Sequence, residues 1–209
     1  MTASGEPGLV RADDARPERP DVLSGRGHTS RGGWATALVV GVILVVVLGG
    51  YVVAAALSEP AGAPIVVAGI VQVQPLTGWA ESDTGTVAGV PFAQVTRGSG
   101  NLRIAALAGR GGSAERLATD YARIVLSREL SQLSVSKELE RVMLDSGIPG
   151  VRFAYVGVVA DSGTSVEGEV TTVVSPAGNG AVFDGWAPAG LLSFVRSDID
   201  TMVDRAEVA

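Results

Sequence analysis

Residues 149–187 read PGVRFAYVGVVADSGTSVEGEVTTVVSPAGNGAVFDGWA. This stretch contains three runs rich in Val, Phe, Tyr and Thr, separated by Asp161-Ser162-Gly163 and by a Pro- and Gly-rich turn at 176–180. β-Branched and aromatic residues favour strands, whereas Gly, Pro, Asn and Asp favour turns. Runs at this spacing are typical of hairpins, so we expect an antiparallel meander over residues 151–187.

The segment that follows the meander, PAGLLSFVRSDIDTMVDRAEV (188–208), predicts a closing helix. Its apolar side chains recur at helical spacing and form one stripe: Leu192, Val195, Ile199, Met202 and Val203. Pro188 is expected at a first-turn position, where the missing N–H of proline costs no helical hydrogen bond.

Upstream of the meander, alternating apolar residues predict a first strand over PIVVAGIVQVQ (64–74), followed by a turn at 75–79. VPFAQVTRG (90–98) and NLRIAALAG (101–109) predict a hairpin. Ser113 is a suitable N-cap for an amphipathic helix that extends to about residue 130. Residues 133–147, LSVSKELERVMLDSG, fit either a strand or a helix, and we favour a strand.

The order of these elements is strands, a helix, more strands and a final helix, with few βαβ crossovers. This order indicates an α+β domain over residues 65–209, built on one antiparallel sheet with helices packed against it. One hydrophobic core is expected for a domain of this length.

Residues 34–57 contain no charged side chain and consist mostly of Val, Leu, Ile, Ala and Gly. A helix of this length rises about 36 Å, which exceeds the roughly 30 Å of hydrocarbon in a bilayer. We therefore expect a transmembrane helix. The alternative is a cleaved signal peptide, but the apolar core is longer than the roughly 7–15 residues typical of such peptides.

The residues on either side of this helix predict the orientation of the chain. Arg19, Arg26 and Arg31 precede the helix closely, whereas no Lys or Arg follows it until Arg97. Basic residues flank the cytoplasmic end of a span, so we expect a single-pass plasma-membrane protein whose C-terminal domain is extracytoplasmic. Residues 1–33 are expected to be a disordered cytoplasmic tail, and residues 58–64 a short linker.

Small residues at a spacing of four occur twice within the span, at Ala37 and Gly41 and at Gly50 and Ala54. Such pairs allow two helices to approach closely, so a homodimer through the span is one expectation.

Composition excludes several functional classes. The net charge is −6, and from Glu59 onward there are 17 acidic and 11 basic residues, so nucleic acid is not an expected partner. Cysteine is absent and the single histidine, His28, lies in the tail. The C-terminal domain therefore contains no thiol nucleophile, Ser-His-Asp triad or His-ligated zinc site, and no cofactor is expected.

Aromatic residues are the candidates for ligand binding. Trp79, Tyr155, Phe183 and Trp186 are expected to be core or cavity-lining residues, and a pocket between sheet and helix would be mostly apolar. Glu167 and Glu169 project from the same side of one expected strand. Paired carboxylates of this kind leave open the alternative of a carboxylate-dependent cell-envelope hydrolase.

The succession of segments also resembles a known family. The segments are GIVQVQPLTGW (69–79), AERLATDYARIVL (114–126), GIPGVRFAYVGV (147–158), EGEVTTVV (167–174), GAVFDGWAP (180–188) and LLSFVRSDIDTMV (191–203). Over residues 65–205 they resemble the PsbP-like domain, including that of actinobacterial envelope proteins. The resemblance implies an α/β/α sandwich and a binding or assembly module for an envelope complex, lipid or cell-wall component, with no catalytic residues to transfer. The chain departs from the envelope relatives, which commonly carry a lipidated cysteine in place of a transmembrane helix.

Overall fold

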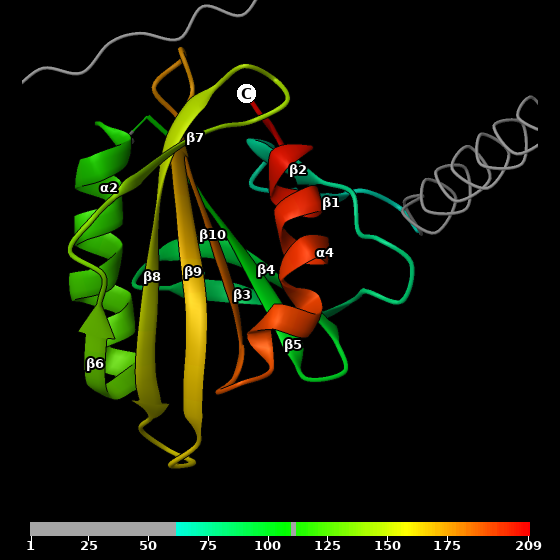
Figure 1. Cartoon of the computed structure of the whole chain (residues 1–209). Coiled ribbons are helices and arrows are strands. Elements are labelled where there is room, and N and C mark those ends of the chain that lie inside the picture. The colour runs from blue at the N-terminus through cyan, green and yellow to red at the C-terminus, as the bar shows by residue number, and fades with distance from the viewer. Residues whose placement is uncertain (1–61, 110–111) are drawn as a thin grey trace, which may run out of the picture. The chain divides into compact units, whose positions relative to one another are not determined.

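The computed structural model describes residues 62–109 and 112–209 (Figure 1). The expected tail (1–33), the expected transmembrane helix (34–57) with its dimer contacts, and residues 58–61 of the linker lie outside the described residues. Within the described ranges, no helix combines the length and the apolar character needed to cross a membrane.

The described elements follow one another in this order: β1 (Ile65–Val67), β2 (Val71–Val73), β3 (Ala80–Val87), β4 (Val90–Arg97), β5 (Gly100–Leu107), α2 (Ala114–Tyr121), the π-helical turn η1 (Ala122–Leu126), α3 (Ser127–Glu129), β6 (Leu130–Val135), β7 (Glu140–Met143), β8 (Pro149–Val159), β9 (Ser165–Val174), β10 (Gly180–Pro188), α4 (Leu192–Asp204) and β11 (Glu207–Val208).

An eight-stranded antiparallel sheet forms the centre of the domain. Its strand order is β3-β4-β5-β10-β9-β8-β6, and β7 also pairs with β8. The predicted meander is confirmed as β8-β9-β10, in which Tyr155 lies opposite Gly168 and Gly168 lies opposite Trp186. The predicted hairpin is confirmed as β4-β5. The strand favoured for residues 133–147 is present as two pieces, the end of β6 and the whole of β7, with a bend at 136–139 between them.

Helices cover both faces of this sheet. The alternation of side chains along each strand creates two apolar faces. In Figure 1, α2 lies on one side of β8, β9 and β10, and α4 lies on the other side. Leu117 and Val125 belong to the core beneath α2, and Ile199 and Met202 to the core beneath α4. The α+β class and the α/β/α layering therefore agree with the expectation.

The sequence prediction of the first helix is confirmed at its N-terminus. The Ser113 hydroxyl accepts a hydrogen bond from the Arg116 N–H, and Glu115 lies in the first turn. The Ser113 hydroxyl thus pairs a backbone N–H of the first helical turn that has no partner within the helix. Glu115 places a negative charge at the positive end of the helix dipole. The helix continues through η1 into α3, and this continuation brings Leu126 and Glu129 over the sheet.

Three details differ from the predictions. The predicted single strand at 64–74 is wrong, because Ala68 and Gly69 take positive φ values of 53° and 69° and turn the chain into the β1-β2 hairpin. This hairpin and β11 form a second, three-stranded sheet. Pro188 is the last residue of β10, so its predicted place in the first helical turn is also wrong. The strand β3 was not predicted, because its residues AESDTGTV are mostly exposed and polar.

The packing of α4 on the sheet requires a glycine at position 185. A Cβ at Gly185 would lie 2.7 Å from Ile199 Cγ2 and 3.1 Å from Cδ1. Contacts this short force either the strand or the helix to move.

We expect Gly185→Ala to lower the free energy of unfolding by about 1–3 kcal/mol, because it overpacks this contact. In an Ile199→Ala background the same change should cost less than half as much, since the clashing atoms are gone. Urea unfolding of the wild type, the two single variants and the double variant measures the coupling. An equal cost in both backgrounds would show that the helix is not what requires the glycine.

Candidate functional site

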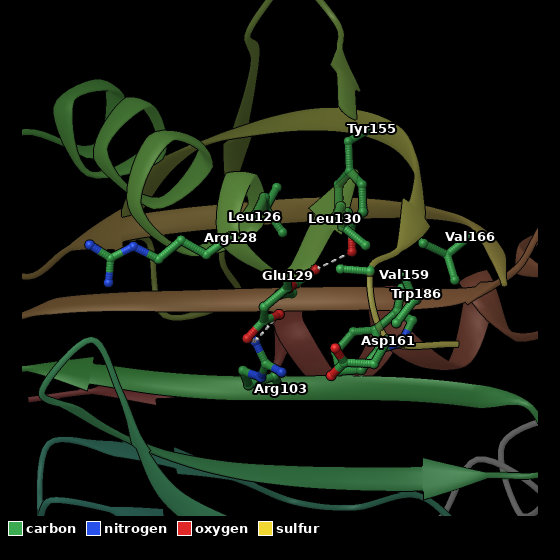
Figure 2. A pocket seen from close by; sticks show the side chains of 12 residues that line it. Arg103, Leu126, Arg128, Glu129, Leu130, Tyr155, Val159, Asp161, Val166 and Trp186 are labelled. Atoms are coloured by element: carbon green, nitrogen blue, oxygen red, sulfur yellow. Dashed lines mark hydrogen bonds and ion pairs between the residues drawn. The ribbon is translucent and has the colours of Figure 1, made fainter. Parts of the chain in front are cut away.

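A cavity of about 400 Å³ opens on the face of the sheet that α2, η1 and α3 cover (Figure 2). Its wall combines charged, aromatic and aliphatic side chains from β5, η1, α3, β6, β8, β9 and β10. The lining residues are Arg103, Leu126, Arg128, Glu129, Leu130, Tyr155, Val159, Ala160, Asp161, Val166, Asp184 and Trp186. We call this cavity the Arg103 pocket.

The floor of the Arg103 pocket contains a buried carboxylate. Asp184 is 2% exposed, and both of its carboxylate oxygens accept hydrogen bonds. Tyr121 Oη donates to Oδ2 and Tyr155 Oη donates to Oδ1, each over 2.8 Å. A buried charge is costly without hydrogen-bond partners. The two tyrosine hydroxyls therefore make it possible for an aspartate to occupy this buried position.

A glycine makes this arrangement possible. A Cβ at Gly168 would lie 2.5 Å from Cζ and 2.6 Å from Oη of Tyr155. Gly168 stands between Tyr155 and Trp186 in the register of β8, β9 and β10. The bare backbone at this position lets the phenol of Tyr155 reach across β9 to Asp184 on β10.

Arg103 is the cation next to this carboxylate. It lies opposite Asp184 in the pairing of β5 with β10. Its Nη1 donates to both carboxylate oxygens of Glu129, over 3.0 and 2.9 Å, and its guanidinium carbon lies 5.3 Å from the ring centroid of Phe92 and 5.2 Å from that of Trp186. Its Nε is buried and has no hydrogen-bond partner among the described residues. The guanidinium is therefore held by one carboxylate and two aromatic rings.

Burial controls the protonation of these groups. It raises the pKa of Asp184 from 3.8 to about 6, although the charge of Arg103 and the hydrogen bonds from the two tyrosines oppose the shift. Burial and the neighbouring Asp184 raise the pKa values of Tyr121 and Tyr155 well above the usual value, so both phenols stay protonated. Burial alone would lower the pKa of Arg103, but Tyr121, Asp184 and Glu129 raise it overall.

A second, smaller cavity of about 120 Å³ lies on the same face of the sheet. Its wall is mostly apolar and includes Ala105 and Val182 of the sheet and Leu117, Tyr121 and Val125 of the helix. This groove is apolar and lies between sheet and helix, but none of the four aromatic candidates lines it, and the larger Arg103 pocket has a polar floor.

The structure separates the four aromatic candidates into two pairs. Tyr155 and Trp186 both line the Arg103 pocket. Trp79 and Phe183 belong to the core on the α4 side of the sheet, where Trp79 Nε1 donates to Asp198 over 3.0 Å. The four residues therefore do not form one site.

The two carboxylates of the hydrolase alternative contact α4. Glu167 Oε1 accepts hydrogen bonds from the backbone N–H groups of Gly190 and Leu192, over 2.9 and 3.0 Å, and so caps the start of the helix. Glu169 forms an ion pair with Arg196 over 2.6 Å. Burial raises the pKa of Glu169, although Arg196 opposes the shift. Over residues 62–109 and 112–209, no group of three His, Cys, Asp or Glu side chains is placed to hold a metal ion.

Four residues of the Arg103 pocket and its floor were not among the candidates from the sequence: Asp184 itself, and Arg103, Tyr121 and Glu129 around it. One signal was available, because Asp184 is the only charged residue in AVFDGWA. An acid in an otherwise apolar strand indicates either an exposed face or a buried polar contact. The hydrogen-bond partners of Asp184 come from distant segments of the chain. Their positions depend on the register of the strands, which the sequence pattern does not predict.

Solved structures similar to this chain include the cyanobacterial PsbP protein of Synechocystis (CyanoP), at 18% identity over 66% of this chain and 86% of that one, with a TM-score of 0.49. LpqN of Mycobacterium tuberculosis, described as involved in cell envelope biogenesis, is 12% identical over 72% of this chain and 90% of that one, with a TM-score of 0.48. The Ran-binding protein Mog1p of Saccharomyces cerevisiae is 10% identical over 72% and 96%, with a TM-score of 0.47.

No protein-family model and no curated protein sequence matches the chain. Each of these structural similarities has a TM-score below 0.5, so the PsbP-like domain suggested by the sequence stays an expectation. They assign no ligand, partner or activity to this chain.

The raised pKa of Asp184 predicts a specific dependence of stability on pH. The folded-state pKa of about 6 exceeds the ordinary 3.8, so the folded state binds the proton more tightly than the unfolded state between these values. The contribution of Asp184 to stability is therefore most favourable below about pH 4, and it declines by roughly 3 kcal/mol as the pH rises through 6.

We expect Asp184→Asn to remove this decline. Urea unfolding of residues 62–209 between about pH 4 and pH 7 should show the wild-type protein losing stability relative to the variant as the pH rises. Asp161→Asn, which changes an exposed acid of the same pocket, is the matched control and should leave the profile unchanged. Parallel profiles for wild type and Asp184→Asn would contradict the assignment.

Proposed function

We propose that this protein is a membrane-anchored, extracytoplasmic binding or assembly module and that the Arg103 pocket is its ligand site. The observation that carries the proposal is the cavity of about 400 Å³ with a satisfied polar floor. Binding pockets of this size combine apolar walls with a few fixed polar groups. Here Leu126, Val159 and Val166 provide apolar wall, and Asp184 and Arg103 provide fixed polar groups.

The chemistry of the pocket favours binding over catalysis. Both oxygens of Asp184 already accept hydrogen bonds from tyrosines, and Arg103 is engaged by Glu129. Groups that serve as general acids or nucleophiles need a free position toward the substrate. The carboxylates of the hydrolase alternative, Glu167 and Glu169, are likewise engaged by α4 and by Arg196.

The location at the membrane follows from the sequence. The uncharged segment 34–57 is long enough to span a bilayer, and the basic residues precede it. The linker at 58–64 is short, so the domain would meet partners close to the outer surface of the membrane.

Photocrosslinking in intact cells tests the ligand site. We expect a photoreactive phenylalanine analogue in place of Arg128, an exposed residue at the rim of the pocket, to give a reproducible adduct with an envelope protein or lipid, identified by mass spectrometry. The same analogue in place of Arg123, an exposed residue on η1 that does not line the pocket, is the matched control. Trp186→Ala should reduce the adduct severalfold because it removes part of the wall.

Two results together would favour the hydrolase instead. One is the absence of any adduct specific to position 128. The other is turnover of a cell-wall substrate that is lost in Glu167→Gln or Glu169→Gln.

A reporter fusion tests the topology. Alkaline phosphatase fused after Ala209 should be active, because this enzyme requires export and the arginines before the span keep the N-terminus inside. A fluorescent protein that folds only in the cytoplasm, fused at the same position, should be dark. The reverse pattern would overturn both the orientation and the extracytoplasmic location of the domain.

A further inference from the structure

Carboxylates dominate the charged part of the wall of the Arg103 pocket. Glu129, Asp161 and Asp184 line it, and the cations on the wall are Arg103 and Arg128. Figure 2 shows the Arg128 side chain extending away from Tyr155 and Trp186. The pocket interior therefore has an excess of negative charge, in a domain that is itself acidic.

The charge of Arg103 is already paired with a carboxylate, although its Nε has no hydrogen-bond partner among the described residues. Its Nη1 donates to both oxygens of Glu129, and its guanidinium lies against the rings of Phe92 and Trp186. Its side chain is 12% exposed. An anion would have to displace Glu129 and would still face Asp161 and Asp184 across the cavity, where like charges repel strongly because water is partly excluded.

Asp161, in contrast, is free to bind a ligand. It is exposed in the turn between β8 and β9, and no described residue donates to it or pairs with it. The ring of Trp186 is partly exposed in the same cavity. A free carboxylate in a pocket attracts an organic cation by charge, and the indole of Trp186, which already carries the Arg103 guanidinium over its ring, provides a partly exposed apolar edge beside it.

We propose that the ligand of the Arg103 pocket carries a compact organic cation, such as an ammonium group, which binds between Asp161 and the aromatic wall. The inference rests on the proposed function, because it requires the pocket to be the ligand site. It adds to that function the chemical class of the group that binds in the pocket, a compact organic cation. The aliphatic residues Leu130, Val159 and Val166 provide contacts for the uncharged part of the same molecule.

Calorimetric titration of the full chain in detergent micelles tests the inference with two matched probes. The first is choline, and the second is its uncharged carbon isostere, in which a tert-butyl group replaces the trimethylammonium group. We expect choline to bind at least about tenfold more tightly, since the two probes share a shape and differ in charge. Asp161→Asn should abolish most of this preference. Asp83→Asn, which removes an exposed acid on β3, should leave it intact.

Other outcomes distinguish failure of this inference from failure of the proposed function. Equal binding of both probes, or a preference for choline that Asp161→Asn leaves unchanged, overturns the cation assignment but is compatible with a ligand pocket. Lack of choline binding overturns the cation assignment as well. The proposed function fails only if, in addition, crosslinking from position 128 yields no specific adduct.

Discussion

The buried carboxylate of Asp184 imposes the strictest requirement on this structure. A charged oxygen without water must be hydrogen-bonded, and each Asp184 oxygen receives one tyrosine hydroxyl. Tyr121 comes from the end of α2 and Tyr155 from β8, so the network links the helix to the sheet at a defined position. Removing either hydroxyl would leave an unsatisfied oxygen in the core, which is more costly than the loss of an ordinary surface hydrogen bond.

Several features of the sequence become intelligible from this requirement. Gly168 is needed because any side chain there would overlap the phenol of Tyr155. Arg103 is needed as a nearby positive charge, and its own burial is compensated by Glu129 and by two aromatic rings. Charges of opposite sign thus follow one another from Asp184 on β10 through Arg103 on β5 to Glu129 on α3, which reaches solvent, and Arg103 Nε is the buried side-chain atom left without a hydrogen-bond partner among the described residues. Networks of this kind are stable only when nearly all members are satisfied.

The sequence predicted the parts of the fold that depend on local pattern. The meander at 151–187 and the hairpin β4-β5 combine apolar alternation with Gly- and Asn-containing turns, and both signals point to the same structure. The hairpin β1-β2 was missed because Ala68 takes a positive φ, which its residue type does not favour. Pro188 was misassigned because proline suits a strand end at the sheet as well as a first helical turn.

The pocket was predictable only in part, for a physical reason. Aromatic residues such as Tyr155 and Trp186 are identifiable from the sequence, but the sequence does not tell which face of the sheet each one occupies. The observed register places Trp186 and Asp184 on the α2 face and Phe183 on the α4 face, since neighbours in a strand alternate. A register shifted by one residue would exchange these faces and would move the carboxylate away from both tyrosines. The polar floor therefore depends on this register, because only this register brings the Asp184 carboxylate to both tyrosine hydroxyls.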